Sequence, residues 1–304
     1  MSNLLIIGSV AFDSVETPGG RVDNALGGSA LYASAAASLL NPVDLVGVVG
    51  TDFSMSDIDF LKDRGVDLRG LEVQEGGTFR WAGVYETDMN IRHTTLTELN
   101  VFADFNPVIP DAYKSDGIVF LGNIAPALQL SVLDQLNEPE WVALDTMDFW
   151  IEGSLDELRK VIERVHMLIV NDSEARALTG ESDTIRAARA ILDMGPKAAV
   201  VKKGEHGVLL CTEGEFAVLP AMPLESVKDP TGAGDTFAGG MLGYLASTSD
   251  FSPENLRRSL AYGTAAASRV VEDFSLDALR TATLDELNQR YEKLRQIAAI
   301  PPIQ

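Results

Sequence analysis

The sequence is short of several kinds of residue, and each shortage excludes a class of protein. Its 304 residues include one cysteine, Cys211, and three histidines, His93, His166 and His206. A single cysteine cannot form an intramolecular disulfide, and so few Cys and His ligands argue against a zinc site. No apolar run approaches the ~18 residues that span a bilayer. A signal peptide requires a positively charged segment at its start, but no Lys or Arg precedes Arg21. We therefore expect a cytoplasmic protein with no membrane partner.

Basic residues are also scarce. Lys and Arg total 24 against 45 Asp and Glu, which gives a formal net charge of −21. Such a field repels polyanions and argues against a nucleic-acid polymer as partner, although a local pocket can still hold a small phosphorylated ligand. With 46% apolar and 23% charged residues the chain has a globular composition, and it is long enough to bury a core without disulfides or metals.

Short apolar runs recur along the chain and predict its strands. Runs without polar alternation are typical of strands buried on both faces of a parallel sheet. Six such runs stand out: Leu4–Ile7, Val43–Val49, Ile118–Leu121, Val142–Leu144, Met167–Val170 and Ala198–Val201. Helical segments lie between them, so the pattern predicts an α/β fold with a mostly parallel central sheet flanked by helices.

Two segments interrupt this alternation, residues 13–25 and 78–104. Both are polar, rich in turn-forming residues and β-leaning, with too many charges for central parallel strands. We predict that they are insertions that form a small antiparallel sheet, a lid, on a single domain spanning residues 1–304.

The segment DPTGAGDTFAGG, residues 229–240, carries the clearest chemical signal. Small, flexible residues at 231–234 allow successive backbone N–H groups to converge on one anion. A helical pattern follows at once, so the dipole of a helix N-terminus adds to the attraction for negative charge. Asp235 lies in the first turn of that helix. An anion site beside a carboxylate is what phosphoryl transfer to a hydroxyl requires.

The same segment closely resembles the C-terminal signature of the ribokinase family, the PfkB-type carbohydrate kinases. Four further segments are similar to family motifs in the expected order: GSVAFD at 8–13, GGSALYASAAA at 27–37, NDSEARALTG at 171–180 and VKKGEHGVLL at 201–210. The resemblance implies a ribokinase-like fold, with a central sheet flanked by helices and a small β-sheet lid. It also implies homodimerisation through that lid.

The resemblance further implies a role for each matching residue. Asp235 is the catalytic base, and the anion hole is formed by Gly232, Ala233 and Gly234. Substrate is bound by Asp13, Gly27, Gly28 and Tyr32. ATP is bound by Asn171, Glu174, Lys202, Gly204 and Gly207, and Glu174 reaches Mg²⁺ through water. In some members a monovalent cation such as K⁺ is held at the positions of Asp229 and Thr231.

Some positions depart from the family pattern. Tyr32 stands where the family usually has an asparagine, which makes ribose itself a doubtful substrate because sites built to bond hydroxyls discriminate strongly. Glu272 and Asp273 stand where a glycine is expected near the adenine, so the preference for a nucleotide base stays open.

The predicted lid and one strand end supply further candidates, and those in the lid also have a purely structural interpretation. Alternate spacing places three aromatic residues on one face of a strand, where they either stack on substrate or pack within the lid: Phe79, Trp81 and Tyr85. Arg80 and Arg92 are candidates for binding an acidic or phosphorylated substrate, or are solvated. Asp145 follows a strand, at the edge where open α/β sheets bind ligands.

These observations favour an ATP-dependent kinase for a hydroxyl of a small sugar or sugar-like substrate. A nucleoside kinase of the same family is the alternative, and a ligand sensor without catalytic activity is a third hypothesis. A dinucleotide-binding dehydrogenase is disfavoured because the first strand is not followed by G-x-G-x-x-G. The chain also lacks the G-x-x-x-x-G-K-[ST] pattern of P-loop nucleotidases.

Overall fold

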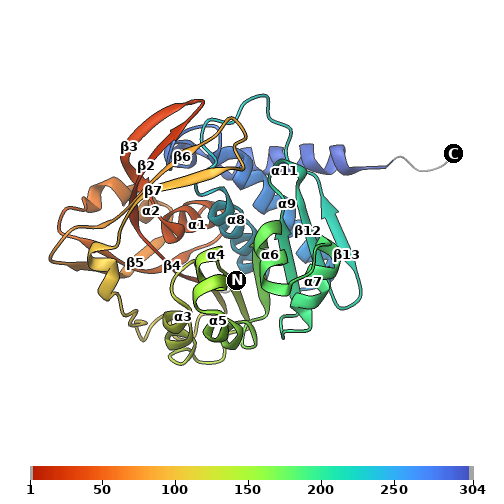
Figure 1. Ribbon diagram of the computed structural model, residues 1–304, viewed down its shortest axis with the longest axis horizontal. Coiled ribbons are helices and arrows are strands. Elements are labelled where there is room, and N and C mark those ends of the chain that lie inside the picture. Colours follow the sequence, from red (N-terminus) through yellow and green to blue (C-terminus); the bar gives the residue numbers. More distant parts are fainter. Residues whose placement is uncertain (1–2, 301–304) are drawn as a thin grey trace.

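The computed structural model describes residues 3–300 and contains two β-sheets (Figure 1). The larger sheet has nine strands in the order β13-β12-β11-β10-β9-β8-β1-β4-β5. Its strands are β1 (Leu4–Ile7), β4 (Val43–Gly50), β5 (Val66–Gln74), β8 (Ile118–Leu121), β9 (Trp141–Asp145), β10 (Met167–Asn171), β11 (Ala198–Lys202), β12 (Val208–Thr212) and β13 (Phe216–Leu219). All pairings from β11 to β5 are parallel, whereas β12 and β13 pair antiparallel at one edge.

Helices cover both faces of this sheet. The α-helices are α1 (Ser29–Ala37), α2 (Asp59–Asp63), α3 (Pro126–Leu133), α4 (Asp148–Gly153), α5 (Leu155–Ile162), α6 (Asp172–Thr179), α7 (Thr184–Leu192), α8 (Ala233–Thr248), α9 (Pro253–Val270), α10 (Asp277–Thr281) and α11 (Leu284–Ala298). Short 3₁₀ helices are η1 (Met55–Ile58), η2 (Asn100–Asp104) and η3 (Gly204–His206). Leu4 and Ile6 pack in one core with α1, α8 and α9, while Leu5 and Ile7 pack in the other with α3 to α7. Alternate residues of one strand thus enter two cores, which explains its continuous apolar run.

The six predicted strands are confirmed as β1, β4, β8, β9, β10 and β11. Three strands of this sheet were not predicted. β5 carries charged and exposed residues because it lies at an edge, so it lacks a continuous apolar run. β12 and β13 form a hairpin at the opposite edge, where β13 is only half-buried.

The second sheet, which we call the small sheet, has four strands in the order β3-β2-β6-β7. They are β2 (Ala11–Thr17), β3 (Gly20–Gly27), β6 (Phe79–Tyr85) and β7 (Arg92–Glu98), and they match the two predicted insertions to within a few residues. The prediction of an antiparallel sheet was partly wrong, because β2 and β6 pair parallel. β2 follows β1 in the chain, and β6 follows β5. Because β1 and β5 run parallel, β2 and β6 leave the central sheet in the same direction. Figure 1 shows the small sheet standing away from the central one.

Close packing of α1 on α8 brings two helix N-termini together. A Cβ on Gly239 would lie 2.1 Å from the Ala33 carbonyl oxygen, and one on Gly243 would lie 2.8 Å from the Ala37 Cα. Glycine in α8 and alanine in α1 therefore permit the backbones to approach. Within residues 3–300, no helix is both long and apolar enough to cross a bilayer.

Candidate active site

Three polar side chains end neighbouring strands at the carboxyl edge of the central sheet. Asp145 ends β9, Asn171 ends β10 and Lys202 ends β11. The Lys202 Nζ atom lies 3.5 Å from Asp145 Oδ1, so an ion pair joins two of these strands. Parallel strands direct their carboxyl ends to the same edge, which is where open α/β sheets bind ligands.

Asn171 and Glu174 form the capping box of α6. The Asn171 side chain accepts a hydrogen bond from the Glu174 N–H at 2.8 Å, and Glu174 Oε2 accepts one from the Asn171 N–H at 2.7 Å. The Asn-x-x-Glu spacing therefore has a local structural role. Burial, with Asp145 nearby, raises the pKa of Glu174 to about 7.

The glycine-rich loop leads directly into α8. Gly232 is the N-cap residue with φ of 73°, a left-handed conformation that favours glycine, and no side chain caps the helix. The Ala233 N–H donates to the Pro230 carbonyl at 3.2 Å. A Cβ on Gly234 would lie 2.9 Å from Lys202 Nζ, so the loop passes directly beside this ammonium group. The arrangement combines a helix N-terminus with a positive charge, as an anion site requires.

Asp235 lies in the first turn of α8, close to the charges of Asp145 and Lys202. Burial and the Asp145 charge raise its pKa to about 7, against the opposing effect of Lys202. The pKa of Lys202 is raised as well, because the carboxylates of Asp145, Glu174 and Asp235 outweigh its burial. Lys202 is therefore a permanent cation, whereas Asp235 titrates near neutrality, as is suitable for a general base.

Asp13 lies on β2 beside the two glycines of the Gly27-Gly28 pair. A Cβ on Gly27 would lie 2.0 Å from Asp13 Oδ2, and Gly28 has φ of 93°, so neither position accommodates another residue without displacement. Asp13 is buried, and burial together with the charges of Asp229 and Asp235 raises its pKa to about 7. Residues 13 and 235, far apart in the sequence, therefore face one region.

Tyr32 packs into the core beneath this region. Its side chain is 1% exposed, and its buried hydroxyl has no hydrogen-bond partner among the described residues. Its pKa is raised well above the ordinary value by burial and by the charges of Asp13, Asp229 and Asp235. The hydroxyl therefore lies near enough to these carboxyl groups for their charge to act on it, without a hydrogen bond to any of them.

Asp229 and Thr231 connect the glycine-rich loop with the small sheet and with the segment after α9. Buried Asp229 accepts hydrogen bonds from the Thr231 N–H at 2.8 Å and from the Ser275 N–H at 3.5 Å. The Thr231 hydroxyl lies 3.2 Å from the Tyr85 hydroxyl on β6. The sequence gives no signal for Ser275, because it is far from Asp229 in the chain and belongs to no motif. In the structure it adopts a φ of 56°.

Gly204 and Gly207 shape the turn after β11, where both have positive φ. A Cβ on Gly204 would lie 2.7 Å from Asn90 Oδ1. The amide of Asn90, in the turn between β6 and β7, donates to Glu205 Oε2 at 2.9 Å. The tip of the small sheet therefore touches the turn predicted to border ATP.

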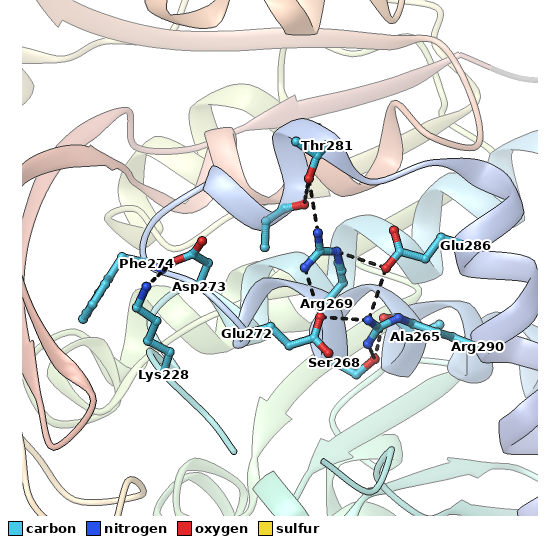
Figure 2. Close-up of polar contacts among 11 residues, drawn as sticks. Lys228, Ala265, Ser268, Arg269, Glu272, Asp273, Phe274, Thr281, Glu286 and Arg290 are labelled. Atoms are coloured by element: carbon cyan, nitrogen blue, oxygen red, sulfur yellow. Dashed lines mark hydrogen bonds and ion pairs between the residues drawn. The ribbon is translucent and has the colours of Figure 1, made fainter. Parts of the chain in front are cut away.

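Glu272 and Asp273 are held by cations (Figure 2). Glu272 Oε2 accepts from Arg269 at 3.0 Å and from Arg290 at 2.8 Å, and Asp273 Oδ1 lies 2.5 Å from Lys228 Nζ. Arg269 and Arg290 also pair with Glu286 of α11. Glu272 and Glu286 thus fasten α11 to the end of α9, whereas Asp273 ties the segment after α9 to Lys228, which precedes the glycine-rich loop. Both Glu272 and Asp273 therefore have cationic partners within the protein.

The site combines a helix N-terminus, a cation and a carboxylate that titrates near neutrality. The sequence model described as pfkB family carbohydrate kinase matches residues 1–282. The chain belongs to this family. It is therefore a phosphotransferase with an alcohol group as acceptor, and the resemblance found in the sequence is confirmed.

Among relatives of this pfkB family kinase, a cytidine kinase of Thermococcus kodakarensis is 33% identical over 249 residues, which cover 80% of this chain and 88% of the relative. Solved structures share its ribokinase-like fold. A protein of E. coli described as a ribokinase II, in complex with ATP and Mg²⁺, has a TM-score of 0.78 at 21% identity over 96% of this chain and all of its own. A Burkholderia thailandensis nucleoside kinase in complex with inosine has a TM-score of 0.74 at 21% identity, over 96% and 98% of the two chains.

Proposed function

We propose that this pfkB family kinase transfers the γ-phosphoryl group of ATP to a hydroxyl of a nucleoside. The similarity to the cytidine kinase, which extends over most of both chains, favours a nucleoside over the free sugar that the sequence placed first. The observation that carries the kinase chemistry is the position of Asp235, with a pKa of about 7, at the uncapped N-terminus of α8 beside Lys202.

The proposed step is a direct displacement. Asp235 accepts the proton of the acceptor hydroxyl as its oxygen forms a bond to the γ-phosphorus, and the bond from that phosphorus to the β-phosphate oxygen breaks to release ADP. Backbone N–H groups at Gly232 and Gly234 and the charge of Lys202 stabilise the transferring group. The Ala233 N–H, also assigned to the anion hole, must turn from the Pro230 carbonyl to join them. The carboxyl groups of Asp145, Glu174 and Asp235 keep Lys202 in its charged form, so its ammonium group is available to phosphate.

Substrate and cofactor are assigned to the two sides of Asp235. The Asp13 carboxylate accepts hydrogen bonds from the other hydroxyls of the substrate, and the backbone at Gly27 and Gly28 also bonds to them. Mg²⁺ would neutralise charge on the β- and γ-phosphates when bound. The described residues contain no group of three Asp, Glu, His or Cys side chains that could hold a metal. That fits an ion held mainly by phosphates and water, with Glu174 in its outer shell.

Other predicted features stay predictions. The K⁺ site at Asp229 and Thr231 is one such prediction. Both Asp229 oxygens accept backbone hydrogen bonds, so they have partners without a cation. The single domain with two insertions and the lid role of the small sheet are others. Homodimerisation through that sheet is also untested; exposed Ile91, Leu96 and Leu99 in and beside β7 are the apolar side chains that such an interface would cover.

The deciding experiment is an ADP-release assay with Mg²⁺ and ATP over nucleosides, pentoses, hexoses, sugar acids and sugar phosphates. Nucleoside-dependent release that exceeds release with every free sugar supports the proposal. Turnover with free sugars alone contradicts it and restores the sugar kinase. Tight ligand binding without any turnover identifies a sensor.

A further inference from the structure

One face of the small sheet continues the substrate side of the site. Register places Asp13 of β2 beside Trp81 of β6, and Tyr85 of β6 beside Arg92 of β7. Residues two apart on a strand share a face, so Asp13, Trp81 and Tyr85 point the same way. Because Asp13 and Tyr85 reach the glycine-rich loop region, this is the face turned toward Asp235.

Trp81 is held in a fixed position on that face. A Cβ on Gly83 would lie 2.3 Å from the indole ring, so the ring covers a residue that has no side chain. The indole N–H donates to the Thr94 hydroxyl at 3.3 Å. The glycine and the hydrogen bond together fix the ring against the sheet.

Arg92 lies over this indole. Its guanidinium carbon is 5.2 Å from the ring centroid, within the range of a cation–π contact. Arg92 is exposed and forms no salt bridge with any other residue from 3 to 300, unlike Arg80 on the other face, which pairs with Asp52 at 2.8 Å. Arg92 is paired with Tyr85 in the register, so its side chain lies on the face turned toward Asp13 and Asp235, and its charge lowers the pKa of both carboxyl groups. It donates a hydrogen bond to the Tyr85 hydroxyl but has no carboxylate partner among residues 3–300, so donors of its fork remain available to a substrate.

We propose that Arg92, supported by Trp81, binds the base of the nucleoside and determines which bases are accepted. This inference rests on the proposed nucleoside kinase activity. With the sugar hydroxyls at Asp13 and Asp235, the base extends along the small sheet to the indole and the guanidinium. A phosphate or carboxylate on the substrate is disfavoured there, because the charges of Asp13 and Asp235 also act on the position of Arg92.

The chemistry of the guanidinium defines the selected class. Arginine has donors only, arranged as a fork, so it matches two adjacent acceptors. Cytosine offers O2 and N3, and guanine and hypoxanthine offer O6 and N7. Uracil places an N–H next to its carbonyl groups, and adenine places an amino group beside N7. Arg92 therefore selects cytidine, guanosine and inosine over uridine and adenosine.

The test compares kcat/KM for cytidine and uridine in the wild type, in Arg92→Lys and in the control Arg21→Lys. Arg21 is an exposed arginine of the same sheet that pairs with Asp23. We expect the wild type and the control to prefer cytidine about ten- to a hundredfold, the discrimination that one bidentate pair supplies. Arg92→Lys keeps the charge but loses the fork, so its ratio falls to within about threefold of unity.

Each ratio is measured within one protein, so a partly unfolded variant still reports it. Calorimetric titration of both nucleosides without ATP gives a second measurement. An unchanged ratio in Arg92→Lys overturns the assignment, as does a wild type that prefers uridine. A wild type that phosphorylates sugars and no nucleoside refutes the proposed function itself, which is a different result from an unchanged ratio.

Discussion

The ring of Tyr32 packs directly against Gly232, so that a Cβ built on this glycine would lie 2.4 Å from the Cγ and Cδ2 atoms of the ring. Tyr32 belongs to α1, whereas Gly232 opens α8. The aromatic residue that replaces the expected asparagine therefore supports the glycine-rich loop from below. Its hydroxyl, buried without a partner among the described residues, faces the carboxylates of the site.

Gly232→Ala should abolish most of the activity while the chain still folds. The substitution adds a side chain at φ of 73° and forces it against the Tyr32 ring, so the loop must move. We expect kcat to fall about a hundredfold, because displacement of an anion site by about 1 Å costs roughly that much. Gly180→Ala is the control, since Gly180 has the same positive φ but no atom near its Cβ. Equal kcat losses in the two variants would mean that backbone strain, and not contact with Tyr32, matters.

Asp235→Asn should remove the proton acceptor and leave nucleotide binding measurable. A general base contributes about 10²- to 10⁴-fold to the rate, and the amide cannot accept the proton. We expect kcat, measured by ADP release, to fall by a factor in that range, while calorimetry still detects nucleotide binding. Asp104→Asn, at an exposed position, should have no effect. Retention of more than about a tenth of the wild-type turnover would remove Asp235 from the role of base.

The pH dependence of kcat/KM should report the raised pKa of Asp235. Only the ionised carboxylate accepts a proton, so the rate should rise with pH through a midpoint near 7, where the pKa of Asp13 also lies. Asp145→Asn removes a charge that raises the pKa of Asp235, so it should move this midpoint to lower pH. A midpoint that does not move in this variant, measured by ADP release from about pH 5 to about pH 9, would contradict the electrostatic assignment.

The sequence predicted the centre of the fold better than its edges. Strands β1, β4, β8, β9, β10 and β11 are buried on both faces and therefore appear as apolar runs. β5 is an edge strand with charged residues, and its sequence VDLRGLEVQ gives no such run. Parallel pairing of β2 with β6 depends on where β1 and β5 end in space, which no local pattern encodes.

The site follows the same division. Motif residues such as Asp235 and Lys202 could be found in the sequence, because loop chemistry and strand ends are local properties. The contacts of Ser275 with Asp229 and of Asn90 with Glu205 join segments that are distant in the chain, so only the folded structure reveals them. The sequence also does not show that Arg80 pairs with Asp52 whereas Arg92 lies over Trp81; that depends on which face of the small sheet each occupies.

The last prediction concerns a carboxyl pair at the opposite edge of the central sheet. Asp44 lies near the start of β4 and Asp116 precedes β8, and both are buried. Burial and the Asp44 charge raise the pKa of Asp116 to about 8, and the Asp44 pKa is raised as well, chiefly by burial. Two neighbouring carboxyl groups in this position favour sharing one proton over ionising together.

The sign of the pH effect on stability follows from that raised pKa. The unfolded chain loses the Asp116 proton near pH 4, whereas the folded chain keeps it to about pH 8. Between these values the unfolded state binds fewer protons, so the free energy of unfolding decreases as pH rises and levels off above about pH 8. Asp116→Asn supplies a permanent neutral donor to Asp44. The substitution should therefore raise Tm at about pH 8 by several degrees. In a protein of this size, about 1 kcal/mol in the free energy of unfolding corresponds to roughly 2–4 °C in Tm.

Thermal unfolding at about pH 5.5 and about pH 8.5 measures this effect. The Tm of the wild type should be lower at the higher pH, and the difference should shrink in Asp116→Asn. Asp104→Asn changes the same charge at an exposed position and should retain the wild-type difference. If Asp116→Asn lowers Tm at both pH values by the same amount, the side chain is needed as a carboxylate and the shared proton is absent.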